Sequence, residues 1–185
     1  MIISVNDLKK YITTDVADEV LEARLQALEL SIRTYTHNHF HKKGFKTFAN
    51  CADGKLVCDL PQFFKAEDTV EISCSYYNEG LYTVSAIDGS TFTLNTELLP
   101  EDSVLVYKIE YPADVKMGVV DIMKWKLKNE AANSGDTSKK DIQSETISRH
   151  SVTYATDSTE SDIDERFGVP RKYMAFLKSY IKPRF

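Results

Sequence analysis

The segment TVEISCSYYNEGLYTVSAIDGSTFTL, residues 69–94, decides the fold. Apolar and polar side chains alternate along it, and Asn78-Glu79-Gly80 and Asp88-Gly89-Ser90 interrupt the alternation with residues typical of tight turns. Because a period of two places successive side chains on opposite faces of a strand, the pattern predicts antiparallel strands. In the first strand, one set of side chains is expected to face a core and the other to face water: Val70, Ile72, Cys74 and Tyr76 against Glu71, Ser73 and Ser75.

Further alternating segments lie on both sides of this stretch: FKTFAN (45–50), KLVCDL (55–60) and SVLVYKIE (103–110). We therefore expect residues 45–111 to form one antiparallel β module, either a curled sheet or a small barrel, because closure removes exposed strand edges. The three cysteines lie within this module, at spacings that match neither a disulfide framework nor a zinc site: Cys51, Cys58 and Cys74. They are interpreted as small apolar strand residues in a reducing compartment.

Helical patterns flank the β module. Residues 1–44 contain a short helix capped by Ser4, over residues 5–11, and a long helix that is expected to start at Thr14-Asp15 and end near His39. Residues 112–133 restore the helical period. The long helix has a predicted buried stripe (Val16, Val20, Leu21, Leu25, Leu28, Ile32, Tyr35) and a predicted solvent face (Glu19, Glu22, Arg24, Glu29, Arg33).

The last third of the chain is predicted to be an arm. Residues 134–168 are mostly polar and surround a strand-like segment, residues 145–155, that contains ISRHSVTY (147–154). Residues 169–185 form a predicted short helix and anchor, stopped by Pro183. The expected fold class is α+β: a small antiparallel helical bundle with an inserted antiparallel β-sheet or barrel module and an extended C-terminal arm that ends in a short helix.

Composition limits the function classes. The chain of 185 residues has a net charge of −5 and a pI near 5.4, which argues against a protein whose main activity is to bind nucleic-acid phosphates. The N-terminal residues do not resemble a signal peptide, and no apolar run has the length of a membrane span. We therefore expect a protein that is made and kept in a cytoplasm, or in a particle assembled there, with no membrane contact.

Catalytic and metal motifs are weak. His37, His39 and His41 have a spacing that metal sites use, but they lie at a predicted helix end, where imidazoles favour the helix dipole without a metal. The acidic run over residues 157–165 lacks the glycine of a calcium loop, and no nucleophile elbow or phosphate-binding loop occurs. The sequence predicts no catalytic residues, no metal, no cofactor and no enzymatic activity.

The C-terminus is different in kind. Residues 169–185 carry five cations, no acid and six large apolar side chains: Tyr173, Met174, Phe176, Leu177, Tyr180 and Phe185. This helix either docks on its own bundle or binds another chain. The second interpretation suits the last four residues, KPRF, because a proline that stops a helix before a terminal phenylalanine is a poor core element.

The order of these parts, with SYYNEGLYTVSAIDGSTFTL, SETISRHSVTY and GVPRKYMAFLKSYIKPRF, resembles the head-tail connector (adaptor or head-completion) proteins of long-tailed bacteriophages of Gram-positive bacteria, over essentially the whole chain. The resemblance implies a structural virion protein that forms a ring of about twelve copies beneath the portal protein. Such a ring, assembled in the host cytoplasm, links the DNA-filled capsid to the next neck protein, the stopper. The resemblance also implies that double-stranded DNA passes through the ring without specific binding.

The resemblance implies portal binding by the C-terminal residues Tyr173, Phe176, Leu177, Tyr180, Lys182, Pro183, Arg184 and Phe185. A second hypothesis concerns the strand-like octapeptide, which is suited to strand addition onto a neighbouring subunit or the portal. Its contact residues are Ile147, Arg149, His150, Val152 and Tyr154. The alternative is that the octapeptide pairs with the chain's own β module.

Three other functions are open at this stage. One is a tail-completion or stopper protein of the phage neck. Another, of a different class, is a metal-dependent hydrolase that uses His37, His39 and His41. The third is a nucleic-acid binder that uses the basic residues 170–185.

Overall fold

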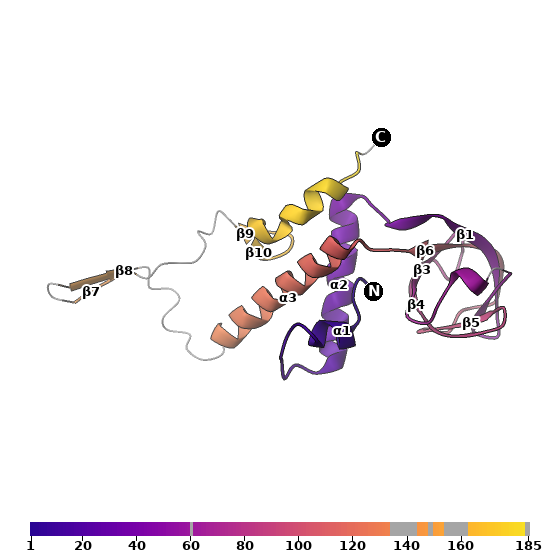
Figure 1. Ribbon diagram of the computed structural model, residues 1–185, viewed down its shortest axis with the longest axis horizontal. Coiled ribbons are helices and arrows are strands. Elements are labelled where there is room, and N and C mark those ends of the chain that lie inside the picture. Colours follow the sequence, from indigo (N-terminus) through magenta and orange to yellow (C-terminus); the bar gives the residue numbers. More distant parts are fainter. Residues whose placement is uncertain (60, 134–143, 148–149, 154–162, 184–185) are drawn as a thin grey trace. The chain divides into compact units, whose positions relative to one another are not determined.

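The computed structural model describes residues 1–59, 61–133, 144–147, 150–153 and 163–183, and it divides into two compact units (Figure 1). The β unit contains Met1–Ile2, His37–Pro112 and the chain from Pro183, and the helical unit contains Ile3–Thr36 and Ala113–Lys182. Helices are combined with an antiparallel sheet, which confirms the predicted α+β class. None of the described helices has the length and apolar character needed to cross a membrane.

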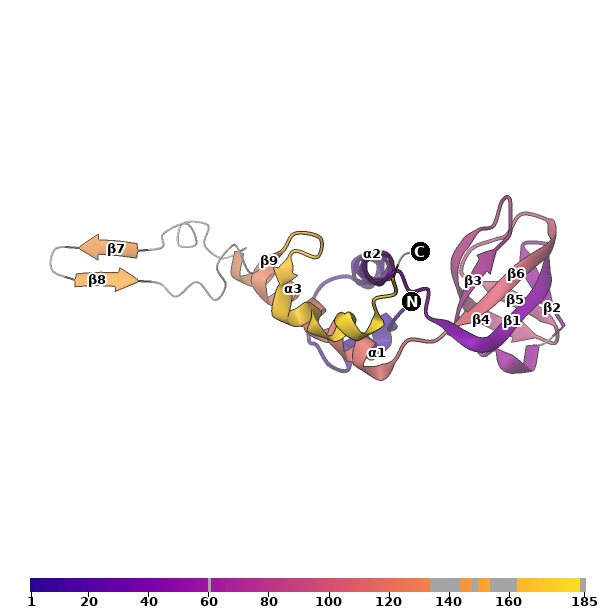
Figure 2. The same cartoon turned by 90° about the horizontal axis from the view of Figure 1, so that it is seen from above.

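The β unit is a closed six-stranded antiparallel barrel, visible in Figure 2. Neighbouring strands follow the order β1-β2-β5-β4-β3-β6, and a 3-10 turn, η1 (Pro61–Phe63), lies in the connection between β2 and β3. The sequence was compatible with either a curled sheet or a closed barrel, and the structure shows a closed barrel. Its strands are β1 (His41–Ala52), β2 (Lys55–Cys58), β3 (Thr69–Ser73), β4 (Gly80–Asp88), β5 (Thr91–Leu94) and β6 (Glu101–Ile109).

The barrel core contains Val70 and Ile72, as the alternation predicted, but not Cys74 or Tyr76. The strand β3 ends at Ser73 because Cys74 adopts a left-handed conformation with φ 58°, and the period of two stops there. Tyr76 is 95% exposed, so its predicted core position is wrong. The same break explains why the three cysteines differ in exposure. Cys51 and Cys58 are buried in the barrel, whereas Cys74 lies beyond the end of β3 and is exposed.

The helical unit begins with α1 (Val5–Lys9), where the Ser4 hydroxyl accepts a hydrogen bond from the Asp7 amide, as an N-cap does. The second helix, α2 (Asp18–Thr36), starts later and ends earlier than predicted. The Thr14 hydroxyl accepts a hydrogen bond from the Val16 amide and so closes a local turn instead of capping the helix. At the other end, His37 has φ 49°, which terminates the helix before the histidines.

The buried face of α2 is wider than the predicted stripe. Its apolar stripe is buried at Leu21, Leu25, Leu28 and Ile32, whereas Val20 is 43% exposed. Glu29 and Arg33, which were predicted to face solvent, are only 3% and 8% exposed. The reason is tertiary: α2 packs against α1 and also against the C-terminal segment, so more than one of its sides is covered.

The third helix, α3 (Ala113–Asn133), matches the predicted helical period, with Val115, Val119, Ile122 and Met123 buried. The chain then returns through a short antiparallel pair, β9 (Ile163–Asp164) and β10 (Val169–Pro170), in which Gly168 has φ 62°. The pair leads into η3 (Arg171–Tyr180), a 3-10 helix that runs beside α3 in Figures 1 and 2.

The strand-like segment forms a separate hairpin. The strand β7 (Ser144–Ile147) pairs with β8 (His150–Thr153) in antiparallel register, with Ile147 opposite His150. The octapeptide 147–154 is therefore not one continuous strand, because it contains the last residue of β7 and all of β8. The two strands belong to a sheet of their own, and among the described residues they do not pair with the closed barrel.

Candidate functional site

The C-terminal helix, expected to bind the portal, makes several contacts within its own unit. The ring of Phe176 covers Gly118 of α3 so closely that a Cβ at position 118 would lie 2.5 Å from Cδ1 of the ring. The hydroxyl of Tyr180 donates to the Asp114 carboxylate at 2.8 Å, and this bond raises the pKa of Tyr180 above its usual value. Leu177 is fully buried, so it packs within the chain and is not available to a partner in this conformation.

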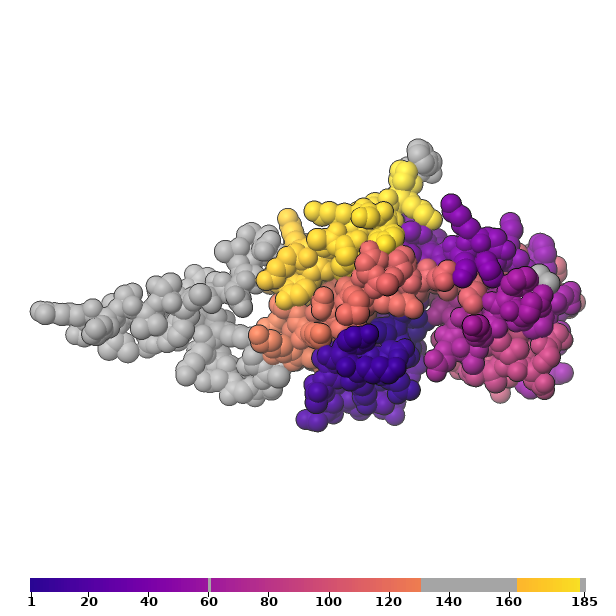
Figure 3. Space-filling model, viewed as in Figure 1, coloured from indigo at the N-terminus to yellow at the C-terminus, as the bar shows by residue number. Residues whose placement is uncertain are grey.

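Tyr173 is half-buried, and its ring lies 6.3 Å from the ring of Trp125 on α3. On the space-filling surface, the segment after Val169 (yellow) lies along α3 (orange) with much of it open to view (Figure 3). The interpretation of this helix as self-docked therefore accounts for its apolar side, and only its outer side is left for a partner.

The end of the chain has a fixed base and exposed side chains. The Lys182 amide donates to the carbonyl of Thr36 at 2.8 Å, which satisfies one of the carbonyls at the end of α2. The side chains of Ile181, Lys182 and Pro183 are nevertheless exposed. Of the predicted portal-binding set, Arg184 and Phe185 lie outside the described residues.

The predicted strand-pairing residues are distributed over the hairpin. Ile147 lies in β7, while His150 and Val152 lie in β8. Arg149 and Tyr154 lie outside the described residues. Every two-stranded sheet has two edges at which a further strand can pair, so a hairpin has the backbone groups that strand addition requires.

Of the three histidines that the sequence offered as an alternative metal site, two lie together with an acid that was not part of that predicted site. His39 and His41 lie beside Glu71 of β3, with His39 Nδ1 at 2.9 Å from Glu71 Oε1 and His41 Nε2 at 2.5 Å from Glu71 Oε2. The three nearest ligand atoms all lie within 4.8 Å of one another. Among the described residues this is the group that could share a metal ion, and His37 is not part of it.

Local backbone structure explains why two histidines meet the same acid. Phe40, between them, is buried against Tyr111 with ring centroids 5.0 Å apart. Its amide donates to the Asn38 side chain and its carbonyl accepts from the Glu110 amide, both at 3.0 Å. With Phe40 held inward in a left-handed backbone conformation (φ 54°), its neighbours His39 and His41 both reach the carboxylate of Glu71.

The loop after β3 is held in place by hydrogen bonds to the first residue of β6. The carboxylate of Glu101 accepts hydrogen bonds from the hydroxyl of Ser75 and the amides of Tyr76 and Tyr77, and these bonds, Ser75 first, lower the pKa of Glu101. Tyr76 and Tyr77 are 95% and 70% exposed. The loop therefore presents two exposed tyrosines on a backbone fixed by hydrogen bonds. This feature was not expected from the sequence, because Tyr76 was predicted to lie in the core.

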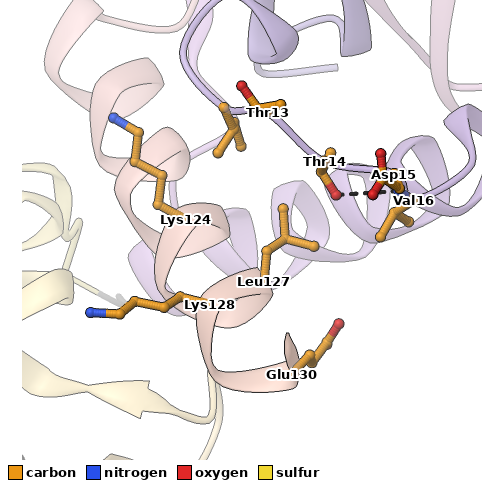
Figure 4. A pocket seen from close by; sticks show the side chains of 9 residues that line it. Thr13, Thr14, Asp15, Val16, Lys124, Leu127, Lys128 and Glu130 are labelled. Atoms are coloured by element: carbon orange, nitrogen blue, oxygen red, sulfur yellow. Dashed lines mark hydrogen bonds between the residues drawn. The ribbon is translucent and has the colours of Figure 1, made fainter. Parts of the chain in front are cut away.

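A groove of about 710 Å³ lies in the helical unit, between residues 12–16 and the last turns of α3 (Figure 4). Leu127 points across it toward Thr14, whereas Lys124 and Lys128 point to the other side. Neither a histidine nor a cysteine is among the residues that line it, so it offers no base or nucleophile of those kinds. A mixed, open lining of this kind resembles a contact surface more than a reaction site.

Comparison with protein-family models gives no match, and comparison with curated proteins gives none either. The residues themselves therefore provide the grounds for assigning a function. They comprise an exposed C-terminal end, a hairpin, two presented tyrosines and one His–His–Glu cluster.

Proposed function

We propose that this protein is a head-tail connector, a structural virion protein that forms a ring beneath the portal of a long-tailed phage. The observation that carries the proposal is the C-terminal end, where the Lys182 backbone is fixed to α2 while Ile181, Lys182 and Pro183 are exposed. A short segment with a fixed base loses little conformational entropy when it binds, which favours an anchor for a pocket on another chain. The resemblance of GVPRKYMAFLKSYIKPRF to the connector family supports the same role.

The portal-binding surface is narrower than the complete C-terminal helix. We assign it to the last four residues, 182–185, and to the half-buried Tyr173 near the start of η3, because Leu177 is buried and Phe176 and Tyr180 contact α3. In this proposal the helical bundle forms the wall of the ring. The contacts of η3 with α2 and α3 hold the C-terminal helix in place.

The hairpin supplies the proposed contact between subunits. A two-stranded hairpin alone is marginally stable in water, so pairing with a strand of a neighbouring subunit or of the portal would stabilise it. Ile147, His150 and Val152 lie within its strands, with Arg149 and Tyr154 beside them in the sequence. The role of the barrel in this assembly is left unassigned.

The acidic balance suits a conduit. With a net charge of −5, the protein lacks the excess of cations that would hold the phosphates of double-stranded DNA. DNA would pass through the ring without specific binding, and the role requires neither a cofactor nor catalysis.

The experiment that tests this proposal is binding to the portal protein of the same phage. A chain that ends at Lys182 keeps the hydrogen bond to Thr36, so its free energy of unfolding should stay within about 0.5 kcal/mol of the full chain. Its affinity for the portal should fall by about thirtyfold or more, the effect of losing a binding hot spot. Lys178→Ala, which removes an exposed cation of η3 outside the proposed surface, is the matched control and should bind normally.

The outcomes separate the candidates. A shortened chain that binds the portal as tightly as the full chain would refute the anchor. A large loss of stability would show that the end belongs to the core. Binding to the tail-side neck protein, with none to the portal, would identify a tail-completion or stopper protein instead.

A further inference from the structure

We infer that His39, His41 and Glu71 form a binding site for a divalent transition-metal ion, with Zn²⁺ as the ion that the donors suit best. Two imidazole nitrogens and one carboxylate are a donor set that zinc sites use. Imidazole also favours transition ions over Mg²⁺ and Ca²⁺, which prefer oxygen donors only. The inference is independent of the connector role, because it concerns the barrel and not the C-terminal end.

The distances between donors are close to those that an ion needs. Around a tetrahedral zinc ion with bonds of about 2.0–2.2 Å, neighbouring donor atoms lie about 3.3–3.6 Å apart. Measured to Glu71 Oε2, the carboxylate oxygen that both histidines approach, the distances are 3.3 Å from His39 Nδ1 and 2.5 Å from His41 Nε2, and the three ligand atoms lie within 4.8 Å of one another. An ion therefore requires His41 and Glu71 to separate by about 1 Å, a shift within the reach of side-chain rotation.

Two of the three ligands are held in place before an ion arrives. The imidazole of His41 is stacked on the ring of Tyr107, with centroids 4.1 Å apart and planes within 5° of parallel. Tyr107 is directly opposite Glu71 in the pairing of β3 with β6, so the residue that orients His41 lies next to the carboxylate. The Glu71 side chain is only 13% exposed, which limits its rotation.

The third ligand is mobile enough to complete the site. The His39 side chain is 62% exposed, so its ring can move by the required distance without disturbing the barrel core. An ion bound here would have three protein ligands and would take water in the remaining position, as three-ligand zinc sites do. It would also link the start of β1, at residues 39–41, to β3. These two strands both neighbour β6 in the barrel.

The test is a titration of tag-free, chelator-treated full-length protein with ZnCl₂, followed by calorimetry, and a parallel titration with CoCl₂, followed by visible absorption. We expect one ion per chain, a visible Co²⁺ band of the intensity typical of a site of low coordination number, and a rise of the melting temperature with Zn²⁺. His39→Ala and Glu71→Gln should each weaken binding by at least about tenfold. His37→Ala is the matched control, since it removes a histidine two positions away that is outside the cluster.

Unchanged affinity in His39→Ala would overturn the site, and so would an equal loss in His37→Ala. Because His39 is mostly exposed, its replacement should not unfold the barrel, and circular dichroism of each variant verifies this. No binding by folded protein would also refute the inference. Any of these results would leave the portal-binding experiment, and therefore the proposed function, unaffected.

Discussion

Replacing Gly118 by alanine should reveal how the C-terminal helix is held. In the interior of an exposed helix, glycine to alanine normally stabilises by about 1 kcal/mol, because alanine has the higher helix propensity. Here a Cβ on α3 would lie 2.5 Å from Cδ1 of Phe176 and closer still to two other ring atoms. Ordinary van der Waals contact begins near 3.5 Å, so the ring would have to move by about 1 Å.

The expected magnitude follows from these two opposing effects. Forcing a methyl group into a packed contact typically costs about 1–3 kcal/mol. Subtracting the gain in helix propensity of about 1 kcal/mol leaves Gly118→Ala neutral to destabilising by about 2 kcal/mol. In a Phe176→Ala background the overlap disappears, so the same change should stabilise by about 1 kcal/mol. The coupling between the two positions is therefore about 1–3 kcal/mol.

Urea unfolding of the four proteins of this cycle gives the coupling. Trp125 is the one tryptophan of the chain and lies on α3 near Tyr173, so its fluorescence reports unfolding of the helical unit. Stabilisation by the same amount in both backgrounds would refute the packing of Phe176 on Gly118. It would then return Phe176 to the proposed portal-binding surface.

Two further predictions concern the barrel. Because hydrogen bonds from Ser75 and its neighbours lower the pKa of Glu101 from 4.5, their stabilising effect should be present above pH 4.5 and lost as pH falls below it. Glu101→Gln should remove this pH dependence from urea unfolding of the barrel, and an unchanged profile would refute the network. For the thiols, Cys74 should react rapidly with a thiol reagent in the native protein, whereas Cys51 and Cys58 should react only after unfolding. Burial raises the pKa of Cys51 to about 11, which also keeps it protonated at pH 8, and three fast-reacting thiols would contradict the buried positions.

The strands and helices were accessible from the sequence because their signals are local. Alternation in residues 69–94 and the turn residues within them identify antiparallel strands without knowledge of any partner. The apolar period of residues 113–133 identifies α3 for the same reason. In both cases the side chains that determine the element lie within a few positions of one another.

Strand ends and burial were harder to predict. Cys74 continues the alternation but leaves the strand, because its left-handed backbone is set by the Ser75–Asn78 loop and its bonds to Glu101. Glu29 and Arg33 have the composition of a solvent face, yet they are buried. Their burial is a tertiary effect, because α2 packs against both α1 and η3, and η3 is a segment more than 130 positions away in the chain.

The amino-acid sequence alone determined the class of the fold, the approximate strands and helices and the basic, aromatic composition of the C-terminal end, all of which depend on neighbouring residues. Only the tertiary structure decided that the barrel closes, that Phe176 packs on Gly118, and that Glu71 meets His39 and His41. The physical reason is sequence separation: Glu71 is 30 positions from His41 and reaches it only because β3 and β1 both pair with β6. The periodicity of side chains within a short segment cannot predict a contact between residues so far apart in the sequence.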